Sequence, residues 1–171
     1  MMRKLKELNL EHQNEINIEN KIIGLNRPCY IIAEIGVNHN GNLDLAKKLI
    51  DASINIGADA VKFQKRNLQS LYTKEALENP NTESQGFEIL LAELKEIELS
   101  KEDYFSIIHY CKEKKITFLC TPWDTPSVDF LEELETSAYK VASGDMTNFP
   151  LLKYISKTGK PMIISTGMSK I

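Results

Sequence analysis

Two lysines lie inside short apolar runs, where a charged side chain is unusual. Lys62 lies in ADAVKFQ and Lys140 lies in AYKVA. Ammonium groups on two strands that share one end of a sheet would together attract an anion. The hydroxyls of Thr121, Ser143 and Ser165 follow later strands and could complete a cradle for a phosphate or a carboxylate. The alternative for each lysine is a solvent-facing side chain or an ion pair with a carboxylate.

A carboxylate also interrupts an apolar run, because Glu34 lies within IIAEIGV. Burying a carboxylate costs free energy unless it is paired. Glu34 could accept hydrogen bonds from a polyhydroxy substrate or transfer a proton. The alternative is a structural ion pair, for which Lys62 is the candidate partner.

The remaining reactive side chains do not predict a metal site or disulfides. His39 lies in the turn at 38–41 without a partner at metal-ligand spacing. We therefore predict that it makes a hydrogen bond that stabilises the loop, and that these 171 residues hold no complete metal site. Cys29, Cys111 and Cys120 are odd in number and widely spaced, so we predict buried thiols in a reducing compartment.

Strands and helices alternate along the chain. The apolar runs predict buried parallel strands, which are nearly continuous in apolar residues. Amphipathic segments follow, and we predict helix caps at Asn42, Ser100 and Thr125. The long segment 65–100 has a polar tip and a predicted helix over 87–94. The predicted strands span 29–37, 58–64, 116–120, 138–142 and 161–165.

This alternation predicts an α/β fold with a parallel sheet. An open doubly wound sheet would concentrate its site at one switch point. Here every predicted strand has polar residues at or near its carboxyl end, which favours a (β/α)8 TIM barrel. A complete barrel needs about 200 residues or more, so we predict a barrel truncated after about five βα units. Residues 1–27 are predicted to be an N-terminal arm, extended or a short hairpin, and 28–171 the partial barrel domain.

Charge and hydropathy exclude several classes of protein. Lysine plus arginine number 21 and aspartate plus glutamate 24, a net charge of −3 that argues against nucleic-acid binding. No apolar run approaches the roughly 18 residues of a membrane span. The start, MMRKLKELNLEHQNE, is too polar for a signal peptide. We therefore expect a cytoplasmic protein with small-molecule substrates and neither nucleic-acid nor membrane partners.

Several motifs resemble one family. The sequence is similar to the sialic acid synthase family, the phosphoenolpyruvate-dependent N-acetylneuraminate synthases and relatives that make legionaminic or pseudaminic acid. The resemblance covers about residues 28 to 169. Its motifs, in order, are IIAEIGVNHNGNLDLAKKLIDA, GADAVKFQK, TPWD, YKVASGD with TNFP, and KPMIISTGMS.

The resemblance implies a reaction and a set of residues. Such enzymes condense phosphoenolpyruvate with N-acetylmannosamine or a related amino sugar and release phosphate. A divalent metal, Mn²⁺ or Mg²⁺, polarises the sugar aldehyde. Glu34 would face the sugar as the catalytic candidate, and Asn81 in the long segment would also contact it. The implied phosphoenolpyruvate-binding residues are Lys62, Thr121, Lys140, Ser143 and Ser165.

The resemblance also implies parts that would lie past Ile171. In the family, two metal-binding histidines and a C-terminal domain that reaches a partner subunit lie on later elements. The complete enzyme is thus expected to be a homodimer, and this chain alone is expected to lack the metal ligands and to be inactive.

Three alternatives remain open. The first is another phosphoenolpyruvate aldol synthase, of the deoxy-heptulosonate or deoxy-octulosonate phosphate type. The second is a Schiff-base aldolase with Lys62 or Lys140 as nucleophile. The third is a truncated product without catalytic activity.

Overall fold

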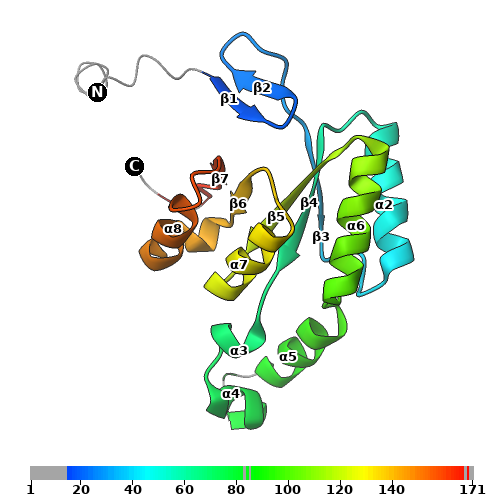
Figure 1. Ribbon diagram of the computed structural model, residues 1–171. Coiled ribbons are helices and arrows are strands. Elements are labelled where there is room, and N and C mark those ends of the chain that lie inside the picture. The colour runs from blue at the N-terminus through cyan, green and yellow to red at the C-terminus, as the bar shows by residue number, and fades with distance from the viewer. Residues whose placement is uncertain (1–14, 83, 85, 168, 170–171) are drawn as a thin grey trace, which may run out of the picture.

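The computed structural model describes residues 15–82, 84, 86–167 and 169. In Figure 1, five parallel strands form one sheet, with neighbours in the order β3-β4-β5-β6-β7. Neighbours follow chain order without a reversal, unlike the doubly wound alternative, whose strand order reverses at a switch point. The strands are β3 (Ile32–Gly36), β4 (Ala60–Lys65), β5 (Thr117–Pro122), β6 (Tyr139–Val141) and β7 (Met162–Ile164).

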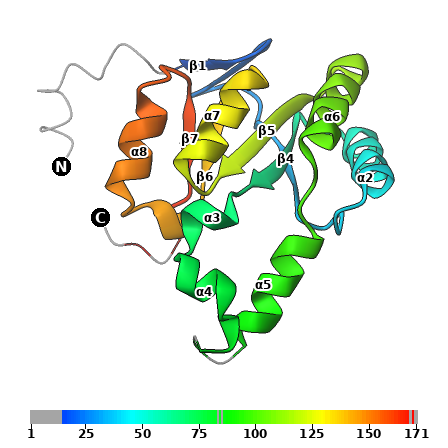
Figure 2. The same ribbon diagram turned by 60° about the horizontal axis from the view of Figure 1, so that its bottom comes forward.

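Helices cover one face of this sheet, and a separate group of short helices follows β4. In Figure 2, where the bottom of Figure 1 is turned toward the viewer, this group lies beyond the carboxyl ends of the strands. None of the helices in the described part of the chain is long and apolar enough to cross a membrane. The covering helices are α2 (Leu43–Asn55), α6 (Lys101–Lys114), α7 (Thr125–Glu133) and α8 (Phe149–Ser156). The other helical elements are α3 (Leu68–Leu71), α4 (Lys74–Glu78), η2 (Pro80–Thr82), α5 (Phe87–Glu96) and η3 (Ser143–Asp145).

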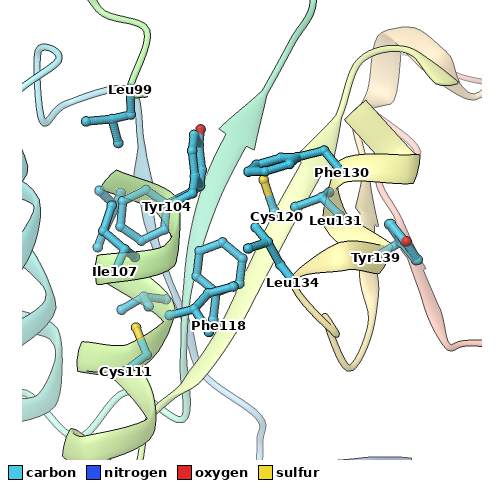
Figure 3. Close-up of a cluster of buried hydrophobic side chains, with 14 of the residues drawn as sticks. Leu99, Tyr104, Ile107, Cys111, Phe118, Cys120, Phe130, Leu131, Leu134 and Tyr139 are labelled. Atoms are coloured by element: carbon cyan, nitrogen blue, oxygen red, sulfur yellow. The ribbon is translucent and has the colours of Figure 1, made fainter. Parts of the chain in front are cut away.

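The larger core lies between the sheet and its covering helices. Figure 3 shows Phe118 and Cys120 of β5 packed against side chains of α6 and α7. Tyr104 of α6 meets Phe130 of α7 edge to face at 5.7 Å. Alternate residues of each strand face this core, because successive side chains of a strand point to opposite faces.

A smaller core lies on the opposite face, which we call the inner face. It joins Ile18 with residues of β3, β4, β5 and β7, including Ala60 and Leu119, and with Ala138 directly before β6. Ile18 ends β1 (Glu15–Ile18), which pairs antiparallel with β2 (Lys21–Gly24). This hairpin therefore closes the inner face at the amino-terminal ends of the strands, and only 1% of Ile18 is exposed.

The strands are staggered relative to one another. Between β3 and β4, Ile32 stands opposite Ala60, so their inner-face apolar residues are level. Between β4 and β5, by contrast, Lys62 stands opposite Leu119, a displacement of two residues. The pattern repeats between β6 and β7, where Lys140 stands opposite Ile163. Between β5 and β6, Cys120 stands opposite Tyr139, so their inner-face residues are level. Over the four pairs the displacement averages one residue per strand, which is the stagger of an eight-stranded barrel with a shear of 8.

Local structure departs from the sequence prediction in a few places. Asp124, not Thr125, caps α7, because its carboxylate accepts the Ser127 amide hydrogen at 2.8 Å. Cys29 is exposed, whereas Cys111 and Cys120 are buried free thiols. The predicted arm contains the hairpin, and its residues 1–14 lie outside the described part. Asn42 and Ser100 cap α2 and α6 as predicted, and Ser100 forms a capping box with Asp103.

Candidate active site

Most of the predicted site residues form one layer on the inner face of the sheet. In each strand or directly beside its end, the polar residue follows the apolar inner-face residue by two positions, which keeps it on the same face. The pairs are Ile32 and Glu34, Ala60 and Lys62, Leu119 and Thr121, Ala138 and Lys140, and Ile163 and Ser165. The second member always lies nearer the carboxyl end of its strand. Five strands thus place five predicted residues above an apolar floor.

Glu34 and Lys62 form an ion pair across β3 and β4. They stand opposite one another, and Lys62 Nζ lies 2.9 Å from Glu34 Oε2. The Lys62 side chain is 5% exposed and that of Glu34 is 57% exposed. The ion pair weighed as an alternative from the sequence is therefore present. Glu34 precedes a β-bulge that ends at Gly36, whose φ of +59° favours glycine.

Lys140 lies between the ends of β6 and β7. Its Nζ donates to the backbone oxygen of Val141 at 2.9 Å and to the Ser165 hydroxyl. Burial lowers the pKa of Lys140; Glu34 raises it and Lys62 lowers it through their charges. The three charges are therefore close enough to interact, and together they give the layer a net positive charge.

Ser143 joins this group from outside the strands. It begins η3, directly after β6. A Cβ placed on Gly167 would lie 3.6 Å from Ser143 Cβ, so the turn after β7 passes beside Ser143. Lys140 lies in β6, Ser143 begins η3 and Ser165 directly follows β7. These three side chains therefore lie around the carboxyl ends of β6 and β7.

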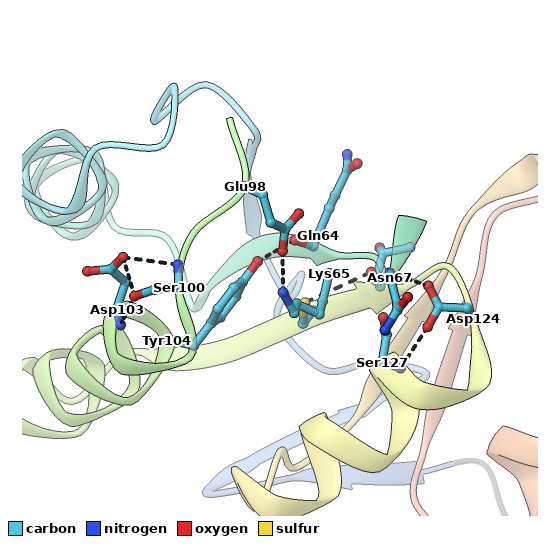
Figure 4. Close-up of polar contacts among 11 residues, drawn as sticks. Gln64, Lys65, Asn67, Glu98, Ser100, Asp103, Tyr104, Asp124 and Ser127 are labelled. Atoms are coloured by element: carbon cyan, nitrogen blue, oxygen red, sulfur yellow. Dashed lines mark hydrogen bonds and ion pairs between the residues drawn. The ribbon is translucent and has the colours of Figure 1, made fainter. Parts of the chain in front are cut away.

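Residues of the TPWD motif form hydrogen bonds between the segments that follow β4 and β5. Asp124 is buried, and its Oδ2 accepts the Asn67 amide hydrogen at 2.6 Å while it caps α7, as Figure 4 shows. The Trp123 amide donates to the Lys65 oxygen at 3.0 Å. Asp124 therefore holds the backbone just beyond Lys62 and Thr121, a positioning role that the sequence reading did not assign to it.

Two residues of GADAVKFQK face opposite sides of the sheet. Lys65 points to the helical side, where it pairs with Glu98 and lies 5.1 Å from the Tyr104 ring centroid (Figure 4). Burial raises the pKa of Glu98 despite this lysine. Gln64 lies on the inner face two residues after Lys62, and its Oε1 accepts from Arg66 at 2.6 Å. Strand periodicity could have identified Gln64 as a member of the layer.

Asn81 lies apart from the layer. It belongs to η2, between α4 and α5, and its side chain is exposed. Figure 2 shows this turn at the tip of the α3–α5 group, away from the sheet. The structure thus brings six predicted residues to the strand ends, and a sugar contact by Asn81 stays a prediction.

His39 serves the loop between β3 and α2. Its Nδ1 accepts the Gly41 amide hydrogen at 3.1 Å, as expected for a loop-stabilising residue. The ring is 1% exposed and stacks on Phe63 with a centroid distance of 5.8 Å. Within residues 15–82, 84, 86–167 and 169, no group of three His, Cys, Asp or Glu side chains could hold a metal ion.

Burial of His39 makes stability depend on pH. Burial lowers the pKa of His39 below its ordinary value of 6.5, so the unfolded chain takes up the proton more readily. The free energy of unfolding should be fully retained above pH 6.5 and should decrease as pH falls below it. Urea unfolding at several pH values should show a flatter profile for His39→Gln. His109→Gln is the control because His109 is exposed; an equal flattening there would contradict the assignment.

A large cavity lies away from this layer. It has a volume of about 620 Å³ and lies between the hairpin turn and the ends of α6 and α7. Its walls include Ile108, Cys111 and Phe118, and none of the predicted site residues lines it. It lies at the amino-terminal ends of the strands, on the opposite end of the sheet from the predicted site residues.

Comparison with known proteins agrees with the motifs. The chain is 41% identical over 150 residues to human N-acetylneuraminate-9-phosphate synthase, covering 87% of this chain and 42% of that protein. It is 43% identical over 148 residues to N,N'-diacetyllegionaminic acid synthase of Campylobacter jejuni, covering 82% and 43%. The chain therefore spans less than half the length of these curated relatives.

Solved structures agree with the fold. A sialic acid synthetase from Leptospira borgpetersenii, in complex with citrate, matches with a TM-score of 0.77 and 31% identity, over 91% of this chain and 50% of that one. A truncated 3-deoxy-D-arabino-heptulosonate 7-phosphate synthase from Thermotoga maritima matches with a TM-score of 0.61 but only 10% identity, over 92% of this chain and 47% of that one, which shows a shared fold alone. The profile of the NeuB family matches residues 49–171. The chain belongs to the NeuB family.

Proposed function

We propose that this chain carries the phosphoenolpyruvate-binding half of a sugar-acid synthase, which condenses phosphoenolpyruvate with an N-acetyl amino sugar and releases phosphate. The observation that carries the proposal is the inner-face layer, in which Lys62 and Lys140 stand among hydroxyls at the carboxyl ends of parallel strands. The NeuB family membership supports the same reaction class. Related proteins are named for N-acetylneuraminate 9-phosphate, legionaminic acid and pseudaminic acid.

The same proposal makes the sheet part of a (β/α)8 barrel. The strand order without reversal and the stagger of one residue per strand both support it. In a barrel, the layer of polar residues would lie at the mouth of the strands, where active sites of this fold are built.

Each residue of the layer has a proposed role. Lys62 and Lys140 neutralise the phosphate and carboxylate groups of phosphoenolpyruvate, and nearby hydroxyls donate hydrogen bonds to their oxygens. Glu34, on the adjacent strand, is placed to accept hydrogen bonds from the sugar. The hydroxyl donors are those of Thr121, Ser143 and Ser165. Asn81 is proposed as a further sugar contact from the long segment.

The experiment that tests the proposal measures binding and turnover separately. We expect phosphoenolpyruvate to raise the melting temperature of the chain, because a ligand that binds only the folded state stabilises it. We expect no phosphate release with N-acetylmannosamine, since the described residues supply no metal site. A chain that melts cooperatively but shows no shift with phosphoenolpyruvate would contradict the proposal. Phosphate release with erythrose or arabinose phosphate, but not with the amino sugar, would favour the heptulosonate or octulosonate type.

A second candidate function rests on Lys140. Burial lowers its pKa, which makes the neutral, nucleophilic amine more accessible than in an ordinary lysine. Such an amine could attack a keto acid carbonyl, lose water and form a Schiff base. Borohydride would reduce that imine to a stable secondary amine, which mass spectrometry locates. An adduct on Lys140 would favour an aldolase, and its absence with pyruvate would remove this candidate.

A further inference from the structure

The ion pair between Glu34 and Lys62 is asymmetric. Lys62 is almost completely buried, so water contributes little to its solvation, and Glu34 supplies its counter-charge at 2.9 Å. Glu34 is more than half exposed and stands at the bulged end of β3. Glu34 is therefore the partner that can move away, because its carboxylate already contacts water. Lys62 would then need another anion as its counter-charge.

Glu34 pairs with Lys62, one of the two lysines proposed to bind the anionic substrate. Lys62 and Lys140 carry two positive charges, and Lys140 otherwise contacts the neutral Val141 oxygen and Ser165 hydroxyl. An anion that bound both lysines would lie next to the Glu34 carboxylate. Two neighbouring negative charges repel one another strongly in a partly buried site. Anion binding and the Glu34–Lys62 contact therefore compete.

We propose that Glu34 is a built-in counter-ion that occupies Lys62 in the free protein and is displaced when the anionic substrate binds. The inference rests on the proposed function and deepens it. Displacement frees the Glu34 carboxylate at the moment when phosphoenolpyruvate is in place, and the sugar hydroxyls then become its partners. Phosphoenolpyruvate and sugar consequently bind with positive coupling, because each takes one partner of the Glu34–Lys62 pair.

The decisive measurement is the affinity for inorganic phosphate and for phosphoenolpyruvate, by calorimetry on the full chain at constant ionic strength. Glu34→Gln keeps the side-chain volume and removes the competing charge. We expect it to bind both anions about 5-fold more tightly than the wild type, the scale of one partly exposed ion pair. Glu132→Gln is the matched control: Glu132 pairs with Lys160 at 2.7 Å on the helical side and should leave both affinities unchanged.

The outcomes separate this inference from the proposed function. If the wild type binds neither anion, both fail. If it binds them, but Glu34→Gln binds them equally or more weakly, Glu34 only holds Lys62 in place and the inference alone fails. Glu34→Ala, checked for a cooperative melt, should tighten binding in the same direction. In the wild type, saturating phosphate should also tighten N-acetylmannosamine binding, and this coupling should vanish in Glu34→Gln.

Discussion

Replacing Lys140 by methionine is expected to lower the affinity for phosphoenolpyruvate about 100-fold, the effect of removing one partner from a partly buried charge pair. Methionine has a similar length and should pack against the ends of β6 and β7 without leaving a cavity. The loss should therefore come from charge and hydrogen bonding. Lys140 is the sharper test of the two lysines, because Lys62 already has Glu34 as a partner.

Calorimetric titration of phosphoenolpyruvate into the wild type and Lys140→Met measures this effect. Lys157→Met is the matched control, since Lys157 is an exposed lysine just after α8, 6.0 Å from the Tyr154 ring centroid. Equal affinities for wild type and Lys140→Met would show that the anion binds elsewhere. A 100-fold loss in both variants would point to general charge rather than to this layer.

Much of the fold follows from local sequence. Buried strands and capped helices are short-range patterns, so the five strands and the caps at Asn42 and Ser100 appear where the sequence predicts them. The two-residue alternation also fixes which face Lys62 and Lys140 occupy. Helix boundaries are less certain, because Asp124 and Thr125 are both good caps, and the structure selects Asp124 through its bond with the Ser127 amide.

Features that depend on distant contacts could not be predicted. Ile18 closes the inner face, but its four-residue strand gives no signal of the residues it meets. The choice between a free and a paired Glu34 depends on register, which sets Lys62 opposite it. Asn81 shows the same limit, because the folding of the long segment into α3, α4, η2 and α5 decides where that side chain lies.

The glycine of the NHNG motif is expected to tolerate no side chain. Gly41 has a φ of +69°, and an added Cβ would lie 2.5 Å from the Glu96 backbone oxygen at the end of α5. The positive φ costs about 1–2 kcal/mol in an L-residue, and the overlap costs about 1–3 kcal/mol more. Gly41→Ala should therefore lower the free energy of unfolding by about 2–5 kcal/mol.

Gly57→Ala separates the two contributions. Gly57 has a φ of +79°, but no heavy atom lies within 4 Å of its added Cβ, so only the backbone cost of about 1–2 kcal/mol remains. Urea unfolding of both variants tests this difference; equal losses would mean that the α5 backbone yields to the new methyl group. Because the 38–41 turn follows the Glu34 bulge directly, a displaced Gly41 should also weaken phosphoenolpyruvate binding, whereas Gly57→Ala should not. We therefore predict that Gly41 affects the site through the packing of the turn backbone against α5.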